Sequence, residues 1–452
     1  MSSSGRLPDE AASQHPLDPS ASFLAGEAFR SMVAKYATVV IGTGISVLLA
    51  RVLEADGRGA YAYVVALASS VAWASHLSVE TGLVLSWSSR DRHENLVGAS
   101  IAIAVLVGGA AALLASGWLV VGEPESPQGV ETWMLAVALA TTPGVLLSLY
   151  MNAVLANEGR IPDLNRVALA AAGAQLVALI GLISLGNLDV GSAVVLWAIG
   201  MTTPSVILFW IVARTTGIAR PSLRGTWHLL AVGLKFHIGV LAFALILRVD
   251  VLLLAGRVDV AQLGIYSIAV ALVELTLVAT SALSQVALQV QVLGKPEDHR
   301  EFAALVTRAN WVLAAFVLIG LLALGPWGIA FVFGDSYRGT FGSVLLLAPG
   351  VLALASSRPL GVYLARLERP FLMSAGMAAG LAANIVLNLV LIPSLGIEGA
   401  ALASSFVYIG IFVWLAIWFS RTTGLGPRHL TPGIRDVEQM WHGFRTQISD
   451  SR

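Results

Sequence analysis

The chain alternates between long apolar segments and short polar connections from about residue 30 to residue 420. A helix needs about 20 apolar residues to cross the hydrocarbon core of a bilayer. Asn95–Gly122, for example, contains no charged residue at all. The apolar segments lie at residues 30–53, 60–87, 96–121, 132–156, 163–186, 190–213, 233–256, 262–292, 309–333, 341–365, 370–394 and 399–420. This pattern predicts an all-α membrane protein with about 12 transmembrane helices.

The second half of the chain repeats features of the first half. Ala50–Leu67 and Ala255–Leu272 align at an offset of 205 residues and share several positions, among them Gly59 and Tyr61 of the first copy. The predicted organisation is a disordered cytoplasmic tail (1–28), an N-terminal six-helix lobe (29–215), a cytoplasmic linker (216–232), a C-terminal six-helix lobe (233–420) and a cytoplasmic tail (421–452). Because six is even, two pseudo-symmetric lobes would share one orientation, which is an arrangement found in transporters.

Basic residues are distributed unequally between the two alternating sets of connections. The set that includes both tails carries 20 Lys and Arg residues, whereas the other set carries only four: Arg51, Arg58, Arg257 and Arg338. Short connections rich in Lys and Arg stay on the cytoplasmic side of a membrane. We therefore expect a multi-pass protein of the cytoplasmic (inner) membrane with both termini in the cytoplasm.

Composition supports this interpretation and excludes several classes of function. Hydrophobic residues make up 57% of the 452 residues and charged residues only 12%, and the net charge of zero gives no reason to expect a nucleic-acid partner. The chain has no cysteine, which excludes disulfides and thiolate metal sites. It also lacks a phosphate-binding GxxxxGK[ST] motif. The connections are too short to hold a catalytic domain, which disfavours a membrane-embedded glycosyltransferase or polymerase and predicts that the protein is not an enzyme.

Three groups of motifs resemble one family of transporters. They are Phe29-Arg30 with Ala50-Arg51 and Gly59-Ala60-Tyr61; Gly233–Ile238 with Leu247–Asp250 and Gly264–Ser267; and Pro393–Ala403. Together with twelve spans in two halves, they resemble the multidrug/oligosaccharidyl-lipid/polysaccharide (MOP) exporter superfamily, in particular its polysaccharide transporter (Wzx-type flippase) branch.

The resemblance implies a flippase that works by alternating access. Its substrate would be a polyprenyl-pyrophosphate-linked oligosaccharide used in surface polysaccharide biosynthesis. The partners would be this lipid-linked oligosaccharide, the membrane lipids and the polysaccharide polymerase machinery. No cofactor is implied, but coupling to an H⁺ or Na⁺ gradient is an option. A cation-coupled multidrug exporter of the same superfamily and a lipid II flippase are the alternatives.

Ionisable side chains within the spans are the candidates for the functional site, because charges are costly in lipid and face a cavity or a partner. The candidates for substrate binding are the basic residues of the spans, Arg248, Arg358 and Lys35. The candidates for ion coupling, or for charge partners of these residues, are Asp250, Glu274, Glu80 and His76.

Arg248 lies deepest in its span and is the strongest of these candidates. Its guanidinium group could bind a pyrophosphate through two parallel hydrogen bonds, or it could form a buried ion pair that only holds two helices together. Asp250 is two residues away and points to a different face of a helix. Glu274 is placed either to take up a coupling ion or to pair with Arg248.

Overall fold

The computed structural model describes residues 19–87, 93–122, 126–293, 299–365 and 369–433, and within these ranges every regular element is a helix. The first elements are α1 (Pro19–Ser75), α2 (Val79–Ser86), α3 (His93–Gly122), α4 (Thr132–Ala140), α5 (Thr142–Asn157), α6 (Ile161–Ser184) and α7 (Val190–Thr215). They are followed by α8 (Leu223–Ile246), α9 (Val249–Leu254), α10 (Val260–Leu293), α11 (His299–Phe333), η2 (Asp335–Tyr337), α12 (Thr340–Ala365), α13 (Pro370–Thr423) and η3 (Pro427–His429). The predicted all-α fold is confirmed.

Ten helices among the described residues are long and apolar enough to cross a membrane. Three of them contain a kink, at Glu54 in α1, at Gly325 in α11 and at Gly396 in α13, and the kinks in α1 and α13 each divide their helix into two spans. With these divisions the described helices agree with the twelve spans of the sequence. Gly396 has φ = 57°, and Gly186, which ends the same Ser-Leu-Gly motif in the first half, has φ = 67°. Glycine adopts such angles without the steric cost that a Cβ imposes.

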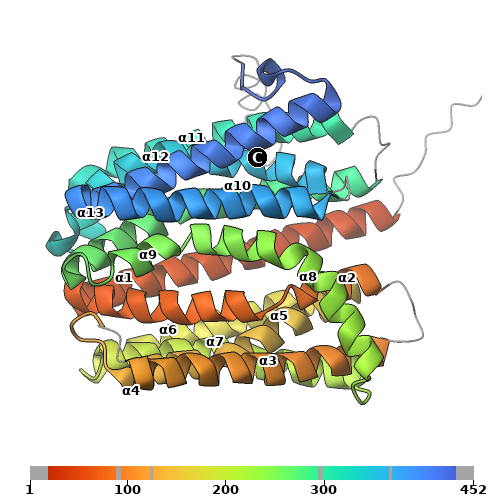
Figure 1. Cartoon of the computed structure of the whole chain (residues 1–452), viewed down its shortest axis with the longest axis horizontal. Helices are drawn as coiled ribbons and strands as arrows, with labels where there is room; N and C mark the ends of the chain where they lie inside the picture. Colours follow the sequence, from red (N-terminus) through yellow and green to blue (C-terminus); the bar gives the residue numbers. More distant parts are fainter. Residues whose placement is uncertain (1–18, 88–92, 123–125, 294–298, 366–368, 434–452) are drawn as a thin grey trace, which may run out of the picture.

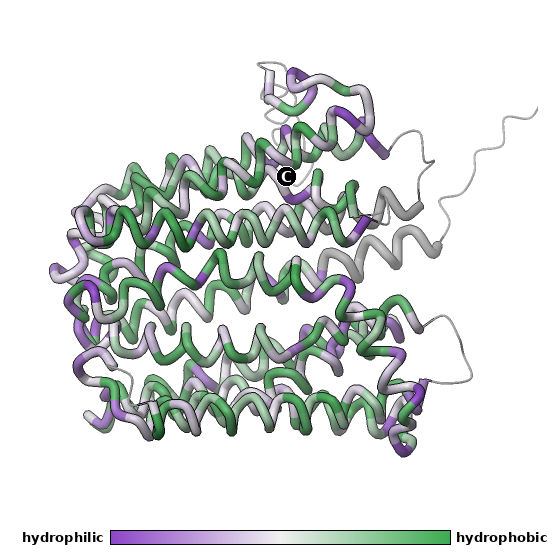
Figure 2. The backbone as a smooth tube through the Cα atoms, viewed as in Figure 1, coloured by the Kyte–Doolittle hydropathy of each residue, from purple (hydrophilic) through white to green (hydrophobic). Residues whose placement is uncertain are grey.

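Figure 1 shows the helices running roughly parallel, with α2–α7 on one side of the molecule and α10–α13 on the other. The helices α1, α8 and α9 lie between these two groups. We call the end where α1 begins the tail side, and the end where α1 turns at Glu54 the far side. Figure 2 shows hydrophilic residues gathered at these two ends and hydrophobic residues along the helices, as a membrane-spanning bundle requires.

The two segments of the sequence repeat pack directly against each other. A Cβ atom added to Gly59 of α1 would lie 2.0 Å from the carbonyl oxygen of Val260, and one added to Gly264 of α10 would lie 2.0 Å from that of Ala55. The contact is thus reciprocal, and it needs glycine at both positions because the two backbones approach so closely. It joins α1 to α10 near the far side.

Polar contacts close the far side around the turn of α1. The Tyr337 hydroxyl shares its one proton between the carbonyl oxygens of Ala50 (3.2 Å) and Glu54 (2.8 Å), and the Tyr337 side chain is fully buried. Glu54 has φ = 54°, an unusual angle for a residue other than glycine. Arg51 donates to the carbonyl oxygens of Val332 and Phe331, which lie at the end of α11. These bonds satisfy carbonyl groups that helix ends leave without a partner.

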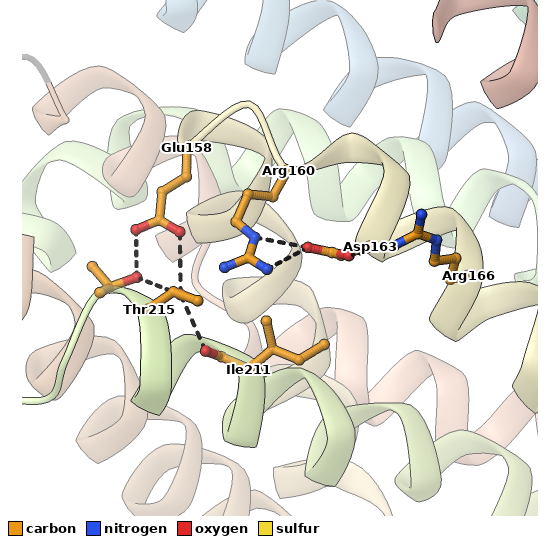
Figure 3. A network of polar contacts seen from close by, with 7 residues as sticks. Glu158, Arg160, Asp163, Arg166, Ile211 and Thr215 are labelled. Atoms are coloured by element: carbon orange, nitrogen blue, oxygen red, sulfur yellow. Dashed lines mark hydrogen bonds and ion pairs between the residues drawn. The ribbon is translucent and has the colours of Figure 1, made fainter.

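On the tail side, polar side chains link the end of α5 to the end of α7, and others stabilise the first turns of α6 (Figure 3). Glu158 accepts hydrogen bonds from the hydroxyl groups of Thr215 and Thr216, and Arg160 pairs with Asp163 at 2.6 Å. Arg166 contacts the other carboxylate oxygen of Asp163 at 3.3 Å. At the opposite end of α7, the amide and hydroxyl of Ser192 hydrogen-bond with Asp189 in a capping box, which holds the pKa of that carboxyl below its usual range.

Several helices extend beyond the apolar segments that predicted them. The helix α1 begins at Pro19, inside the segment expected to be a disordered tail, and α8 begins at Leu223, inside the expected linker. Hydropathy marks only the apolar part of a helix, so polar first turns are assigned to connections. The rest of the predicted tails, residues 1–18 and 434–452, lie outside the described residues.

Candidate functional site

Arg248 lies at a break in the seventh span, which the sequence predicted as one continuous helix. The helix α8 ends at Ile246, and α9 starts at Val249. Arg248 has φ = −135° and ψ = −21°, outside the helical range. From this break its guanidinium Nη1 contacts the Glu274 Oε1 of α10 at 3.1 Å. Glu274 is therefore the charge partner of Arg248 in this structure.

The Arg248–Glu274 pair forms part of the wall of a cavity of about 250 Å³. Side chains of α1 form one side of this cavity, and those of α9, α10 and the break before α9 form the other. Polar atoms enter it from Ser46, Arg58, Tyr61, Arg248, Ser267 and Glu274. We refer to this space as the central cavity. Because α1 and α10 come from different halves of the chain, the central cavity lies where the two repeated segments meet.

Arg58 is the second cation of the central cavity, and it was not among the residues predicted from the sequence. The second span was expected to start at residue 60, which assigned Arg58 to a connection. In the structure Arg58 lies within helix α1, is only 9% exposed, and donates to the Ser46 hydroxyl at 3.2 Å. Its guanidinium carbon lies 5.2 Å from the centre of the Tyr61 ring. Helical spacing could have revealed it, because Arg58, Tyr61 and Val65 share one face of a helix.

The guanidinium group of Arg58 has capacity left for a ligand. Among the residues that the structure describes, its Nε has no hydrogen-bond partner although it is buried. No carboxylate of the described residues forms an ion pair with it, whereas Arg248 is paired with Glu274. The central cavity therefore carries two guanidinium groups against one carboxylate, and an anion placed there would meet a net positive charge.

Asp250 lies outside the central cavity and points into the group of helices formed by α9, α10 and α13. The carboxyl group is 1% exposed and is hydrogen-bonded by the Tyr266 hydroxyl (2.5 Å), the Ser404 hydroxyl (3.2 Å) and the Val251 amide (2.8 Å). These donors satisfy the carboxyl group without Arg248. This agrees with the two-residue spacing, which predicted that Asp250 and Arg248 point to different faces.

Lys35 and Arg358 lie together towards the tail side, away from the residues that line the central cavity. The Lys35 ammonium group contacts the Ser281 hydroxyl of α10 at 3.4 Å. Arg358 is close enough to Lys35 for the two positive charges to interact electrostatically. The helix α12 continues through Arg358 and Pro359 without a break. The structure thus divides the three predicted substrate-binding cations between two places.

His76 and Glu80 form a third group, at a break between α1 and α2. The His76 Nε2 lies 3.5 Å from the Glu80 Oε1, and His76 is fully buried. They do not line the central cavity.

Comparison with solved structures relates this architecture to known transporters. The chain superposes on a structure titled "Lipid II flippase MurJ, inward closed conformation" with a TM-score of 0.71, covering 90% of this chain and 89% of that one at 13% identity. It superposes on an inward-facing multidrug resistance MATE family transporter of the MOP superfamily with a TM-score of 0.61, covering 88% and 98% at 13% identity. The chain has the fold of the MOP transporters.

An outward-facing MATE transporter of the MOP superfamily gives a lower TM-score of 0.55 at 14% identity. No protein-family model matches the sequence, and no curated protein does so either. The predicted fold class is thus confirmed, and the polysaccharide branch stays a prediction.

Proposed function

We propose that this protein is a flippase that moves polyprenyl-pyrophosphate-linked oligosaccharide units across the cytoplasmic membrane for surface polysaccharide biosynthesis. The observation that carries the proposal is the excess positive charge of the central cavity, supplied by Arg58 and Arg248. A pyrophosphate is at least a dianion, and it needs such charge to enter a region of low dielectric constant. Guanidinium groups match its oxygens in pairs.

In this proposal each of the two arginines binds one phosphate of the pyrophosphate. Arg58 has an unpartnered buried Nε within the described residues and accepts the first phosphate without breaking an ion pair. Arg248 is bound to Glu274 and has to exchange the carboxylate for the second phosphate. The polar groups around them, including Ser46 and Ser267, suit the sugar, while the polyprenyl tail stays in lipid.

The direction of transport follows from the expected orientation of the chain. The tail side carries most of the basic residues, which predicts that it faces the cytoplasm. With the far side closed by Tyr337 and Arg51, the substrate would enter from the cytoplasmic leaflet. Separation of α1 from α10 at Gly59 and Gly264 would then release it on the other side.

A transport assay with purified protein tests the proposal. In proteoliposomes that hold a fluorescent polyprenyl-pyrophosphate-linked oligosaccharide, Arg58→Ala and Arg248→Ala should each reduce flipping about ten-fold to a hundred-fold, because one charge-assisted hydrogen bond contributes roughly 1.5–3 kcal/mol. Arg248→Lys should be intermediate, since the charge remains but the paired geometry does not. Arg166→Ala is the control, because Arg166 is 79% exposed and lies far from the cavity on α6.

The double variant Arg248→Ala/Glu274→Ala separates substrate binding from a purely structural role. If the ion pair only held α9 and α10 together, removing both charges would restore flipping that the single variant lost. The proposal expects no rescue, because no cation would remain at that position. Rescue with normal amounts of protein in the membrane would contradict it.

Two other substrates are tested with the same proteoliposomes. Lipid II is one of the alternative substrates, because the chain superposes on a lipid II flippase and lipid II also carries a polyprenyl pyrophosphate. Faster flipping of lipid II than of the oligosaccharide lipid would change the assignment to a lipid II flippase. Export of cationic drugs, with no flipping of either lipid, would favour the multidrug exporter. The positive charge of the central cavity opposes that last outcome.

A further inference from the structure

The break between α1 and α2 is a strained segment on the tail side of the second span. His76, Leu77 and Ser78 separate the two helices. Leu77 and Ser78 both have φ = 50°, a left-handed conformation that side chains other than glycine rarely adopt. Strain of this kind persists only where surrounding contacts hold it, and such places are often functional. The surrounding contacts here come from α5 and α8.

The helix α8 packs very closely on this break. A Cβ atom added to Gly233 of α8 would lie 2.6 Å from the carbonyl oxygen of Leu77, and one added to Gly82 of α2 would lie 2.8 Å from that of Leu229. The His76 ring meets the His237 ring of α8 edge to face, with 5.0 Å between their centres. The same helix contacts α13 in the other group of helices. A shift of α8 on α2 would therefore change helix packing in both groups.

Hydrogen bonds to backbone carbonyl groups fix which ring nitrogens carry a proton. The His76 Nδ1 lies 2.7 Å from the carbonyl oxygen of Trp73, and the His237 Nε2 lies 3.2 Å from that of Ala74. A carbonyl oxygen only accepts, so each of these nitrogens must be the N–H of its ring. The other nitrogen of each ring, Nε2 of His76 and Nδ1 of His237, then carries no proton and is able to bind one.

The two unprotonated ring nitrogens and the Glu80 carboxylate lie close together, and two of their atoms have no hydrogen-bond partner among the described residues. The His76 Nε2 lies 3.5 Å from the Glu80 Oε1 and 3.4 Å from the Ser78 hydroxyl. Within the described residues, the His237 Nδ1 and the Glu80 Oε2 are buried and have no hydrogen-bond partner. His237 is 7% exposed. Two acceptors that are buried without a donor are the arrangement in which an added proton finds a place.

The groups that face this cluster come from every element packed on it. They are His76 and Glu80 at the break and in α2, His237 in α8, and Tyr150 in α5, whose hydroxyl donates to the His76 carbonyl oxygen at 2.7 Å. Tyr150 is committed to that bond. Lys235 is two residues from His237 and is exposed, so it lies on another face of α8. The described groups that can bind a proton in this cluster are therefore the two histidines and the glutamate.

We propose that His76, Glu80 and His237 form a proton-binding site whose occupancy controls the packing of α8 on α2. This deepens the proposed function, on which it rests, by naming H⁺ as the coupling ion and this cluster as its site. One proton is held between the His76 Nε2 and the Glu80 carboxylate, as a His⁺–Glu⁻ pair. A second proton from solvent binds at the His237 Nδ1. This second proton makes both imidazole rings positively charged beside a single carboxylate. The helix α8 then moves away from the break, because the two positive rings repel each other.

The test uses the cysteine-free background of the chain and needs no transport substrate. Ser86 of α2 and His228 of α8 contact each other at 3.1 Å, so Ser86→Cys and His228→Cys place two thiols across the same interface. The full-length protein in nanodiscs is treated with a short bifunctional thiol reagent between about pH 5.5 and pH 8, the range in which histidine titrates. Between pH 8 and pH 5.5, cross-linking in the parent pair should slow about five-fold more than it does in the variants that lack a titrating nitrogen.

Conservative variants remove the titrating nitrogen but keep the existing hydrogen bond. In His237→Gln the amide nitrogen replaces Nε2 towards the Ala74 carbonyl oxygen, and in His76→Asn it replaces Nδ1 towards that of Trp73. Both variants carry the same pair of thiols, so the intrinsic effect of pH on the reagent cancels in the comparison. The difference in cross-linking rate between acidic and alkaline pH should be lost in both, and Glu80→Gln should shift it to lower pH.

His93→Gln is the matched control. His93 also lies on the tail side and contacts the carbonyl oxygen of Trp87 at 2.7 Å, but it is outside the cluster. This variant should retain the full dependence on pH. Equal dependence on pH in the parent, His237→Gln and Glu80→Gln would overturn the proton site. Because cross-linking involves no lipid substrate, that outcome would not contradict the proposed flippase activity. Conversely, an absence of flipping would not contradict the proton site.

Discussion

The ion pair between Arg248 and Glu274 is only partly shielded from solvent, since the two side chains are 39% and 30% exposed. Ion pairs with this much exposure contribute about 0–1 kcal/mol to stability. Glu274 is therefore better understood as a competitor for the Arg248 guanidinium group than as a structural anchor. The Glu274 carboxylate binds the Arg248 guanidinium group until an anion that binds it more strongly displaces the carboxylate.

Glu274→Gln should consequently tighten the binding of a polyprenyl pyrophosphate. Up to about 1 kcal/mol of competing interaction is removed, so affinity should rise by up to roughly five-fold. Ligand-dependent thermal stabilisation of the purified protein measures the change. Asp335→Asn provides the control, because Asp335 forms a similar exposed pair with Arg338 outside the central cavity. Weaker binding in Glu274→Gln would indicate that the carboxylate positions Arg248 and does not compete for it.

At the scale of helices, the close approach of α1 and α10 is the contact on which closure of the far side depends. Gly59→Ala would place a methyl group against the Val260 carbonyl oxygen, where there is room for none. Overpacking of this kind costs about 1–3 kcal/mol and should push the two helices apart. The closed state should therefore become less populated.

Access to the central cavity measures this effect. An Ala62→Cys variant places a thiol in the cavity wall, and an impermeant thiol reagent added from outside the cell reports when the far side opens. Gly59→Ala should speed labelling about five-fold to a hundred-fold. Gly44→Ala on the same helix should have no effect, because a Cβ atom there meets open space. Equal labelling rates in the two alanine variants would show that the glycine contact does not hold the far side closed.

The helices could be predicted from the sequence much better than their breaks. Runs of apolar residues indicate the presence of a span, but a break such as that at Glu54 depends on a distant partner, here the Tyr337 hydroxyl. The same limitation explains why only some residues of the candidate site could be predicted. Arg248 and Glu274 stood out as charges within apolar runs, whereas Arg58 lies beside Asp56 near the end of a span and looked like part of a connection.

At the scale of the whole molecule, the orientation in the membrane stays a prediction from the distribution of basic residues. Single cysteines in the cysteine-free chain can test it in intact cells. An impermeant thiol reagent should label Ser126→Cys, on the far side, and leave Ser222→Cys, on the tail side, unlabelled until the cells are opened. The reverse pattern would invert the orientation and the direction of transport with it.

Closure of the far side also has a consequence for the thermodynamics of opening. Tyr337 satisfies two backbone carbonyl groups at the turn of α1, and Arg51 satisfies two at the end of α11. Once the helices separate, these four groups need new donors, which only water can supply. Opening is therefore a hydration reaction that draws water into the gap between α1 and α10. Solutes that are excluded from protein surfaces, such as sucrose, oppose such a reaction, so osmotic pressure alone favours the closed form without any solute binding to the protein.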